Sequence, residues 1–192
     1  EASGKKTAVL STIRFKIDTN SEPNKYKMTM PGRFFTQHFL RKAVDAGCEY
    51  AIIEMTSEGA RFFRHAHLQL DALIFTNLSP EHIESHGSFE AYKKAKLRLA
   101  QQLAKSKKLA RVAIANIDNE HAPAFLIGDV EKNIGYSLNH VHIISHDEQT
   151  STIKWDDTDI TFPLPVMFNI ANAIAAVTLA EQIGIKEEDA KR

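Results

Sequence analysis

The chain has 192 residues, the length of one domain or of one domain with a small appendage. Its 24 lysine and arginine residues balance its 24 aspartate and glutamate residues, so the formal charge is zero and gives no electrostatic reason to expect binding to nucleic acid or to an acidic membrane surface. Hydrophobic residues make up 43% and charged residues 25%, a composition that is typical of a folded protein and excludes an intrinsically disordered one.

The single cysteine, Cys48, excludes an intramolecular disulfide framework and a zinc site built from cysteines. No run approaches the roughly 18 uninterrupted apolar residues of a membrane span, and no signal-peptide pattern opens the chain. The sequence therefore predicts a protein of a reducing, cytoplasmic setting that binds neither membranes nor nucleic acid.

The first part of the chain alternates between strand and helix patterns. Short apolar runs predict four strands, at residues 7–11, 50–54, 72–76 and 111–116. Apolar residues at helical spacing predict three helices, at residues 32–47, 61–65 and 88–107. The polar stretch 18–26 predicts a loop. The alternation predicts an α/β fold with a mainly parallel sheet flanked by helices, whose strands present their carboxyl ends at one edge, where ligands collect.

From residue 135 the pattern changes to the period of two that is typical of half-buried strands. It predicts a small antiparallel appendage near 135–163, built from segments at residues 135–145, 151–155 and 159–162. A last, mostly apolar helix is expected at 166–183 and should end at Gly184. Because the chain begins without methionine and ends in a charged run, we expect both ends to be cuts through a longer protein, with 1–184 as one domain and 185–192 as the start of a linker.

Glu54 ends an apolar strand of the predicted sheet. A carboxylate in this place lies at the ligand edge of an open α/β sheet, where it could hold a divalent metal ion. The alternative is that it caps the helix that follows. The position of Glu54 alone favours neither interpretation.

Two histidines, His82 and His86, lie four residues apart after the next strand, as in a helical metal-binding pair. No third ligand of that kind accompanies them, and Gly87 indicates that a helix has ended. His82 could therefore act as a single metal ligand or as a donor to phosphate, although a lone histidine is more often structural.

Lys96 lies in the apolar stripe of the longest predicted helix, whose other members are Phe89, Tyr92, Leu99 and Leu103. Burial of a lysine is unfavourable unless its charge is paired, neutralised or chemically modified. The alternative is that its stem lies along the apolar surface and its ammonium group reaches water. A role in a site gains weight because the helix follows directly after the segment that carries His82.

Two amides, Asn169 and Asn172, lie three residues apart where the last helix opens. Asn169 could be the residue that caps this helix. Asn172, one turn further on, has no such structural reason, and we expect it to face a ligand.

In order and spacing, these segments resemble the Mur ligases. The resemblance rests on Glu54-Met55-Thr56-Ser57-Glu58-Gly59, on the stretch from Thr76-Asn77-Leu78-Ser79-Pro80-Glu81-His82 to Lys96, on Asn116-Ile117-Asp118 and on Phe168-Asn169-Ile170-Ala171-Asn172. It covers nearly the whole chain and is greatest with the UDP-N-acetylmuramoyl-tripeptide ligases, which add the third residue of the peptidoglycan stem peptide.

The resemblance implies the central domain of an ATP-dependent ligase with Mg²⁺ as its cofactor and with a UDP-sugar peptide and an amino acid as substrates. A substrate carboxylate would attack the γ-phosphate of ATP, and the amine of the amino acid would displace phosphate from the resulting acyl phosphate. Glu54 and His82 would each hold a Mg²⁺ ion, and Lys96 would be carbamylated and act as a catalytic metal partner. Adenine contacts are implied at Asn169 and Asn172. Contacts to the UDP-sugar peptide are implied at Thr29, Ser57 and Arg64.

The departures from the family pattern concern the sugar-peptide substrate. Glu58 stands where the tripeptide ligases usually have a histidine, Phe62 replaces a polar substrate contact, and Met30 replaces a threonine. The phosphate-binding loop and the C-terminal domain of the family would lie outside residues 1–192, so we expect this chain not to catalyse ligation alone.

Two alternatives follow from these departures. One is a related ligase that acts on folate or a polyglutamate chain, and the other is a Mur-like domain that binds a nucleotide or a partner without turnover. The sequence leaves the oligomeric state and the identity of the added amino acid open.

Overall fold

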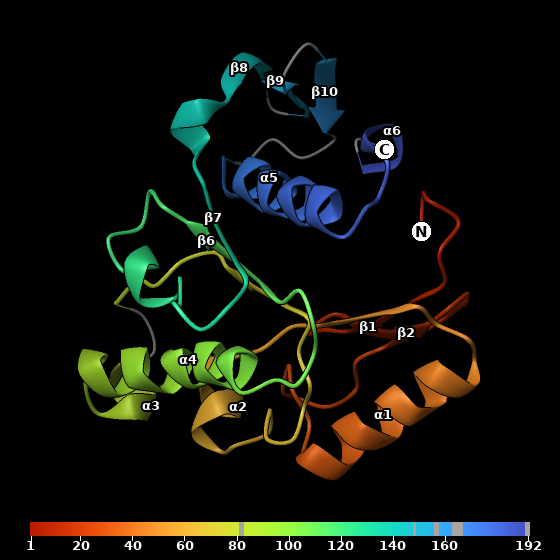
Figure 1. The fold of residues 1–192 in the computed structure, drawn as a ribbon, viewed down its shortest axis with the longest axis vertical. Coiled ribbons are helices and arrows are strands. Elements are labelled where there is room, and N and C mark those ends of the chain that lie inside the picture. The colour runs from red at the N-terminus through yellow and green to blue at the C-terminus, as the bar shows by residue number, and fades with distance from the viewer. Residues whose placement is uncertain (81–82, 148, 156–157, 163–166, 191–192) are drawn as a thin grey trace. The chain divides into compact units, whose positions relative to one another are not determined.

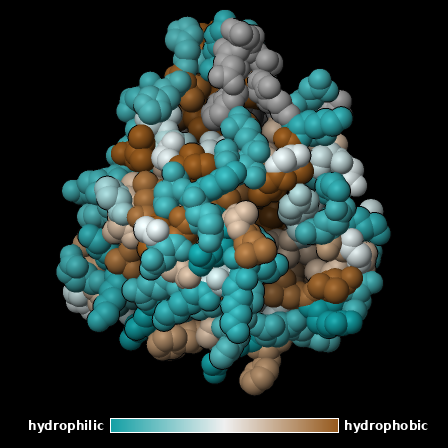
Figure 2. Space-filling model, viewed as in Figure 1, coloured by the Kyte–Doolittle hydropathy of each residue, from teal (hydrophilic) through white to brown (hydrophobic). Residues whose placement is uncertain are grey.

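The computed structural model describes residues 1–192 except 81–82, 148, 156–157, 163–166 and 191–192. The chain divides into two compact units (Figure 1). The first comprises Glu1–Gln69 and Pro80–Ser106, and the second comprises Leu70–Ser79 and Lys107–Arg192. No helix in the described part of the chain is long and apolar enough to cross a membrane. Hydrophilic side chains cover much of the visible surface, and hydrophobic side chains form scattered patches between them (Figure 2).

The first unit contains a four-stranded sheet in the order β3-β2-β1-β4. Its strands are β1 (Thr7–Leu10), β2 (Arg14–Ile17), β3 (Asn20–Pro23) and β4 (Tyr50–Ile53). β1 and β4 pair in parallel, as the apolar runs predict, whereas β1-β2 and β2-β3 are antiparallel.

The prediction of a loop at 18–26 was wrong in part, because Asn20–Pro23 forms the edge strand β3. All four of its residues are exposed, so no apolar alternation marks it in the sequence. Asp18, at the turn before it, has a φ of 54°, a left-handed conformation that aspartate tolerates better than most residues. Pro23 fits at a sheet edge because it has no N–H group to donate to a ladder.

The described residues of the first unit also form the helices α1 (Arg33–Asp45), α2 (Ser57–Arg61), α3 (Ile83–His86) and α4 (Phe89–Ala104). α1 packs Phe39 and Ala43 into a core with Leu10 and Phe15 of the sheet. The prediction of a helix at 61–65 was wrong, because the helix α2 ends at Arg61 and turns follow. It begins at Ser57, where the side chain of Thr56 accepts a hydrogen bond from the Gly59 N–H group at 3.0 Å and caps it.

The second unit contains a three-stranded parallel sheet in the order β5-β6-β7. Its strands are β5 (Ala72–Phe75), β6 (Val112–Asn116) and β7 (Lys132–Tyr136). The helix α5 (Met167–Gln182) packs on this sheet through Ile170 and Ile174, which join Val112 and Ile114 in one core (Figure 1). Two 3₁₀ turns (Ala122–Ala124 and Leu138–His140) and the short helix α6 (Glu187–Ala190) complete the connections.

The predicted antiparallel appendage is also present in the second unit. Strands β8 (His142–His146), β9 (Ser151–Trp155) and β10 (Thr158–Phe162) form a sheet in the order β10-β9-β8. Its expected start at residue 135 was wrong, because Gly135 lies in the parallel strand β7. A glycine is needed there, since a Cβ atom would lie 2.5 Å from Cγ2 of Ile117. The predicted α/β fold with parallel strands, flanking helices and a small antiparallel sheet is thus confirmed, with the β2-β3 hairpin in addition.

Candidate functional site

Glu54 lies at the edge of the first unit's sheet where the parallel strands β1 and β4 end. Its backbone N–H group donates to Leu10 at 2.8 Å, which continues the pairing of the two strands by one residue. Its carboxylate accepts a hydrogen bond from the Thr12 N–H group at 2.8 Å and from the Thr12 hydroxyl, which lies 2.9 and 3.0 Å from the two carboxylate oxygens. Glu54 therefore does not cap the following helix, since Thr56 does so. The carboxylate is held at the ligand edge.

The Thr12 hydroxyl also joins Glu54 to Thr29, whose hydroxyl oxygen lies 2.8 Å from that of Thr12. A carboxylate only accepts hydrogen bonds, and a hydroxyl has a single proton. Thr12 donates that proton to Glu54, so Thr29 must donate its own proton to Thr12. The lone pairs of Thr29 are left to accept a hydrogen bond or to coordinate a cation.

Thr12 was missed by the sequence analysis. The sequence does contain a signal for Thr12, because this residue comes directly after the apolar strand predicted at 7–11. That strand runs parallel to the strand that Glu54 ends. Neighbouring parallel strands end at the same edge, so polar residues that follow both of them meet there.

Arg64 holds the segment that carries Thr29. Its guanidinium group donates to the carbonyl oxygen of Met30 at 2.6 Å and lies 5.6 Å from the ring centre of Phe62. Met30 is fully buried and packs over Gly59, where a Cβ atom would lie 2.9 Å from its sulfur. The residues expected to bind substrate at positions 29 and 64 are therefore neighbours in the fold.

Ser57, the first residue of α2, is buried and forms a hydrogen bond of 3.0 Å between its hydroxyl and Nε2 of His86. The ring of His86 also lies 5.3 Å from that of Tyr92 on α4, centre to centre. His86 ends α3, and Gly87 follows with a φ of 81°, in agreement with the expected end of a helix there. His82, its expected metal-binding partner, lies outside the described residues.

Lys96 lies half-buried on α4, and its amine is 5.2 Å from the centre of the Tyr92 ring. The predicted stripe is confirmed at Tyr92, Leu99 and Leu103, which are buried. The face of an aromatic ring is electronegative, so this contact favours the lysine cation on an otherwise apolar face. Among the described residues no hydrogen bond or ion pair joins Lys96 to Glu54, and no three histidine, cysteine, aspartate or glutamate side chains gather as a metal site.

Asn169 and Asn172 belong to α5 of the second unit. The cap interpretation of Asn169 was wrong, because α5 already includes Met167 and Phe168. Asn169 is half-buried and Asn172 is exposed.

Asp118, part of the motif Asn116-Ile117-Asp118, has a structural task in the second unit. Its carboxylate accepts hydrogen bonds from the Ser137 hydroxyl, from the Leu138 N–H group at 2.8 Å and from the Asn139 amide at 3.0 Å. Burial alone would raise the pKa of Asp118, but these hydrogen bonds outweigh it and hold the pKa below its ordinary value. Asp118 thereby fixes the turn that follows β7.

Parallel strand pairs with flanking helices define an α/β domain, and comparison with known proteins identifies its family. A sequence model described as the Mur ligase middle domain matches residues 1–180. The chain belongs to the Mur ligase family, as its motifs led us to expect.

Among its relatives, the chain is 31% identical over 207 residues to a UDP-N-acetylmuramyl-tripeptide synthetase of Roseiflexus sp. (strain RS-1), covering 98% of this chain and 41% of the relative. It is similar to the structure of a UDP-N-acetylmuramoyl-L-alanyl-D-glutamate–2,6-diaminopimelate ligase, with 26% identity, a TM-score of 0.75 and coverage of 97% of this chain and 39% of that one. A D-alanyl-D-alanyl-adding ligase of Acinetobacter baumannii shares the fold, at 14% identity, a TM-score of 0.66 and coverage of 98% of this chain and 39% of that one. The chain thus spans about two fifths of the length of these relatives.

Proposed function

We propose that this chain is the middle domain of an ATP-dependent ligase that joins an amino acid to the carboxylate of a UDP-N-acetylmuramoyl peptide in peptidoglycan synthesis. In this proposal residues 1–184 form the domain and 185–192 begin a linker. The observation that carries the proposal is the oxygen cluster of Glu54, Thr12 and Thr29 at the strand edge of a Mur ligase middle domain.

The donor set of this cluster fits Mg²⁺, which prefers carboxylate and hydroxyl oxygen atoms. Glu54 holds the ion, Thr12 fixes the orientation of the carboxylate through two donors, and Thr29 offers a lone pair. When bound, Mg²⁺ neutralises negative charge on phosphate groups. His82 is a ligand of a second ion in this proposal.

Lys96 is the residue that we propose to be carbamylated. The lysine cation would first lose a proton, and its neutral amine would then attack carbon dioxide. An N–C bond forms, one C=O π bond of carbon dioxide becomes a C–O⁻ bond, and the nitrogen releases a second proton, so that the product is an anionic carbamate. The position of Lys96, half-buried on the face of α4 that also carries Tyr92 and Leu99, supports the proposal, because a charged side chain on an apolar face is favourable only when it is paired, and an anionic carbamate can pair with a metal ion.

The substrate contacts follow from the donors that remain. Arg64 has five N–H donors, and its contact to Met30 leaves others for the carboxylate or phosphate groups of a UDP-sugar peptide. Thr29 and Ser57 lie on the segments next to it and complete this side of the site. Asn169 and Asn172 supply paired amide groups for the edge of adenine.

The test uses the protein encoded by the complete open reading frame that contains this chain. It is incubated with ATP, Mg²⁺ and a mixture of amino acids, either with UDP-N-acetylmuramoyl dipeptide or with dihydrofolate, and ADP release and product mass are measured. We expect ADP and a new amide product with the UDP-sugar peptide alone. A folate product would replace the proposed substrate, and absence of turnover with both acceptors would identify a binding module.

A matched pair of variants connects the activity to the cluster. Glu54→Gln removes the charge that holds the metal ion and should lower activity at limiting Mg²⁺ by about 10- to 100-fold. Glu22→Gln, on the exposed strand β3, removes the same charge elsewhere in the unit and should leave activity unchanged. Equal losses in both variants would contradict the role of Glu54.

A further inference from the structure

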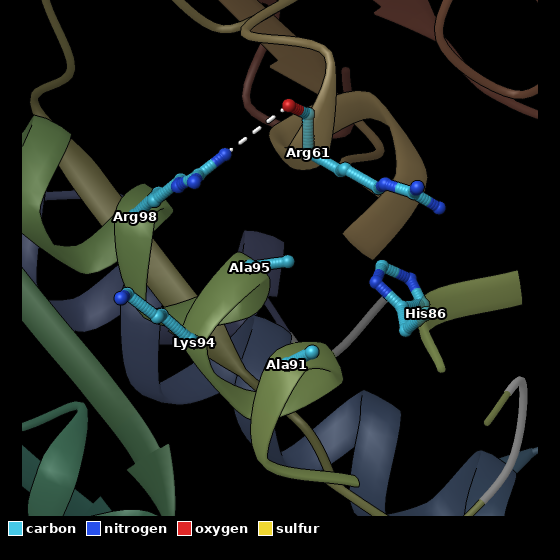
Figure 3. A pocket seen from close by; sticks show the side chains of 6 residues that line it. All are labelled: Arg61, His86, Ala91, Lys94, Ala95 and Arg98. Carbon is cyan, nitrogen blue, oxygen red and sulfur yellow. Dashed lines mark hydrogen bonds between the residues drawn. The ribbon is translucent and has the colours of Figure 1, made fainter. Parts of the chain in front are cut away.

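A cavity of about 200 Å³ lies in the first unit, between α2, α3 and α4. It is lined by Arg61 of α2, by His86 at the end of α3, and by four residues of α4, namely Ala91, Lys94, Ala95 and Arg98 (Figure 3). Ala91 and Ala95 lie one helical turn apart, and their small side chains leave the space open. A water molecule occupies roughly 30 Å³ in the liquid, so the cavity has room for a small polyatomic ion.

Basic side chains dominate the lining of this cavity. Arg61, His86, Lys94 and Arg98 come from three helices, and none of the described residues that line the cavity is acidic. Figure 3 shows the guanidinium group of Arg61 and the ring of His86 on one side and Arg98 on the other side beyond Ala95, whereas the amine of Lys94 points away from these side chains.

The hydrogen bonds that hold Arg61 and Arg98 in place go to uncharged groups. Arg61 donates to the carbonyl oxygen of Ser85, and Arg98 donates to the carbonyl oxygens of Arg61 at 3.1 Å and Ala60 at 3.4 Å. A carbonyl oxygen carries no formal charge. Over the described part of the chain, no ion pair joins Arg61, Arg98 or Lys94 to a carboxylate.

Like charges gathered around one small cavity repel one another, and a bound anion turns that repulsion into attraction. Each arginine has five N–H donors in a planar fork that matches the oxygen atoms of a phosphate or carboxylate group. The carbonyl contacts of Arg61 and Arg98 use only some of these donors. Fixed arginines with spare donors are the groups that proteins use to bind oxyanions.

We propose that this cavity is a binding site for a small oxyanion with the chemistry of inorganic phosphate. The site is separate from the proposed catalytic cluster, because Glu54, Thr29 and Lys96 do not line the cavity. It reaches the proposed substrate contacts through one hydrogen bond, between His86 and Ser57 at 3.0 Å.

The experiment titrates the purified chain with sodium phosphate at constant ionic strength, followed by calorimetry and by the NMR signals of arginine and histidine side chains. We expect saturable binding with a dissociation constant on the order of 1 mM, accompanied by shifts of the Arg61, Arg98 and His86 signals. A parallel titration with malonate distinguishes the two sources of an oxyanion. Tighter phosphate binding identifies a free phosphate ion, and tighter malonate binding identifies the carboxylate of an acidic ligand.

Two substitutions and two controls decide whether the cavity is the site. Arg61→Gln removes a donor and should weaken phosphate binding about tenfold. Ala91→Glu, at an exposed position of the lining, places a carboxylate in the cavity and should abolish binding. Arg33→Gln and Lys105→Gln remove exposed charges elsewhere in the unit and should leave the affinity unchanged. Absence of saturable binding, or equal losses in Arg61→Gln and Arg33→Gln, would overturn the proposal.

Discussion

Replacement of Thr12 by valine tests the hydroxyl chain that joins Glu54 to Thr29. Valine keeps the branched shape but lacks the hydroxyl, so the donor 2.9 Å from the carboxylate and the 2.8 Å contact with Thr29 are both lost. The backbone N–H group of residue 12 still donates to Glu54 at 2.8 Å. A hydrogen bond to a charged group contributes about 1.5–3 kcal/mol. Because Thr12 and Glu54 are exposed, water replaces part of this loss, and we expect the free energy of unfolding to fall by about 0.5–1 kcal/mol.

Urea unfolding followed by far-ultraviolet circular dichroism measures this change. Thr12→Ser retains the hydroxyl and should keep most of the stability. Thr19→Val removes a hydroxyl from an exposed turn residue of the same unit and should change the free energy of unfolding by less than about 0.5 kcal/mol. The reasoning would be refuted by a loss in Thr12→Ser as large as that in Thr12→Val, or by indistinguishable values for the valine variants at positions 12 and 19.

Three further predictions concern His65, Gly135 and Tyr136. Burial lowers the pKa of His65 below its ordinary 6.5, so the unfolded chain binds the proton more readily than the folded chain. The contribution of His65 to stability is therefore complete above pH 6.5 and is lost as the pH falls toward the lowered pKa. Urea unfolding at about pH 7 and about pH 5.5 should show that the free energy of unfolding falls less between these pH values in His65→Leu than in the unchanged chain. Gly135→Ala forces a Cβ atom against Ile117 and should lower the free energy of unfolding by about 1–3 kcal/mol. At the control position, the Cβ atom of Gly128→Ala meets open space, so this variant should be neutral or stabilising in the same assay. Similar losses of stability in the two variants would contradict the close contact at Gly135. Tyr136→Phe removes a buried hydroxyl that has no hydrogen-bond partner among the described residues, so thermal unfolding should show unchanged stability or a gain of up to about 1 kcal/mol, and a clear loss would reveal a partner.

The parts of the fold that the sequence predicts are those in which burial decides the structure. Thr7–Leu10 and Val112–Asn116 are largely buried apolar runs, and the structure contains both as strands with a parallel partner. Asn20–Pro23 has no apolar residue except proline, and only its pairing with β2 makes it a strand. Lys132–Tyr136 mixes polar residues with a glycine, so its pairing with β6 has no signature of its own.

The same distinction holds for the candidate site. Glu54 is recognisable because a carboxylate that ends an apolar strand breaks a pattern. Thr12 breaks no pattern, and its importance arises only when two strands bring it within 2.9 Å of Glu54. The cationic cavity likewise has no sequence signature. Arginines such as Arg61 and Arg98 are common on protein surfaces, and only the packing of α2 against α4 brings these two together.

The outer strand β3 also bears on the behaviour of this protein in concentrated solution. An exposed sheet edge offers unpaired backbone groups to a strand of another molecule, and such pairing begins aggregation. β3 is short, and it carries Glu22 and Pro23 side by side on that edge. The charge repels an approaching strand edge of like charge, and the proline lacks the N–H group that a new ladder requires. The residues that hide β3 from sequence analysis therefore also protect the sheet against self-association.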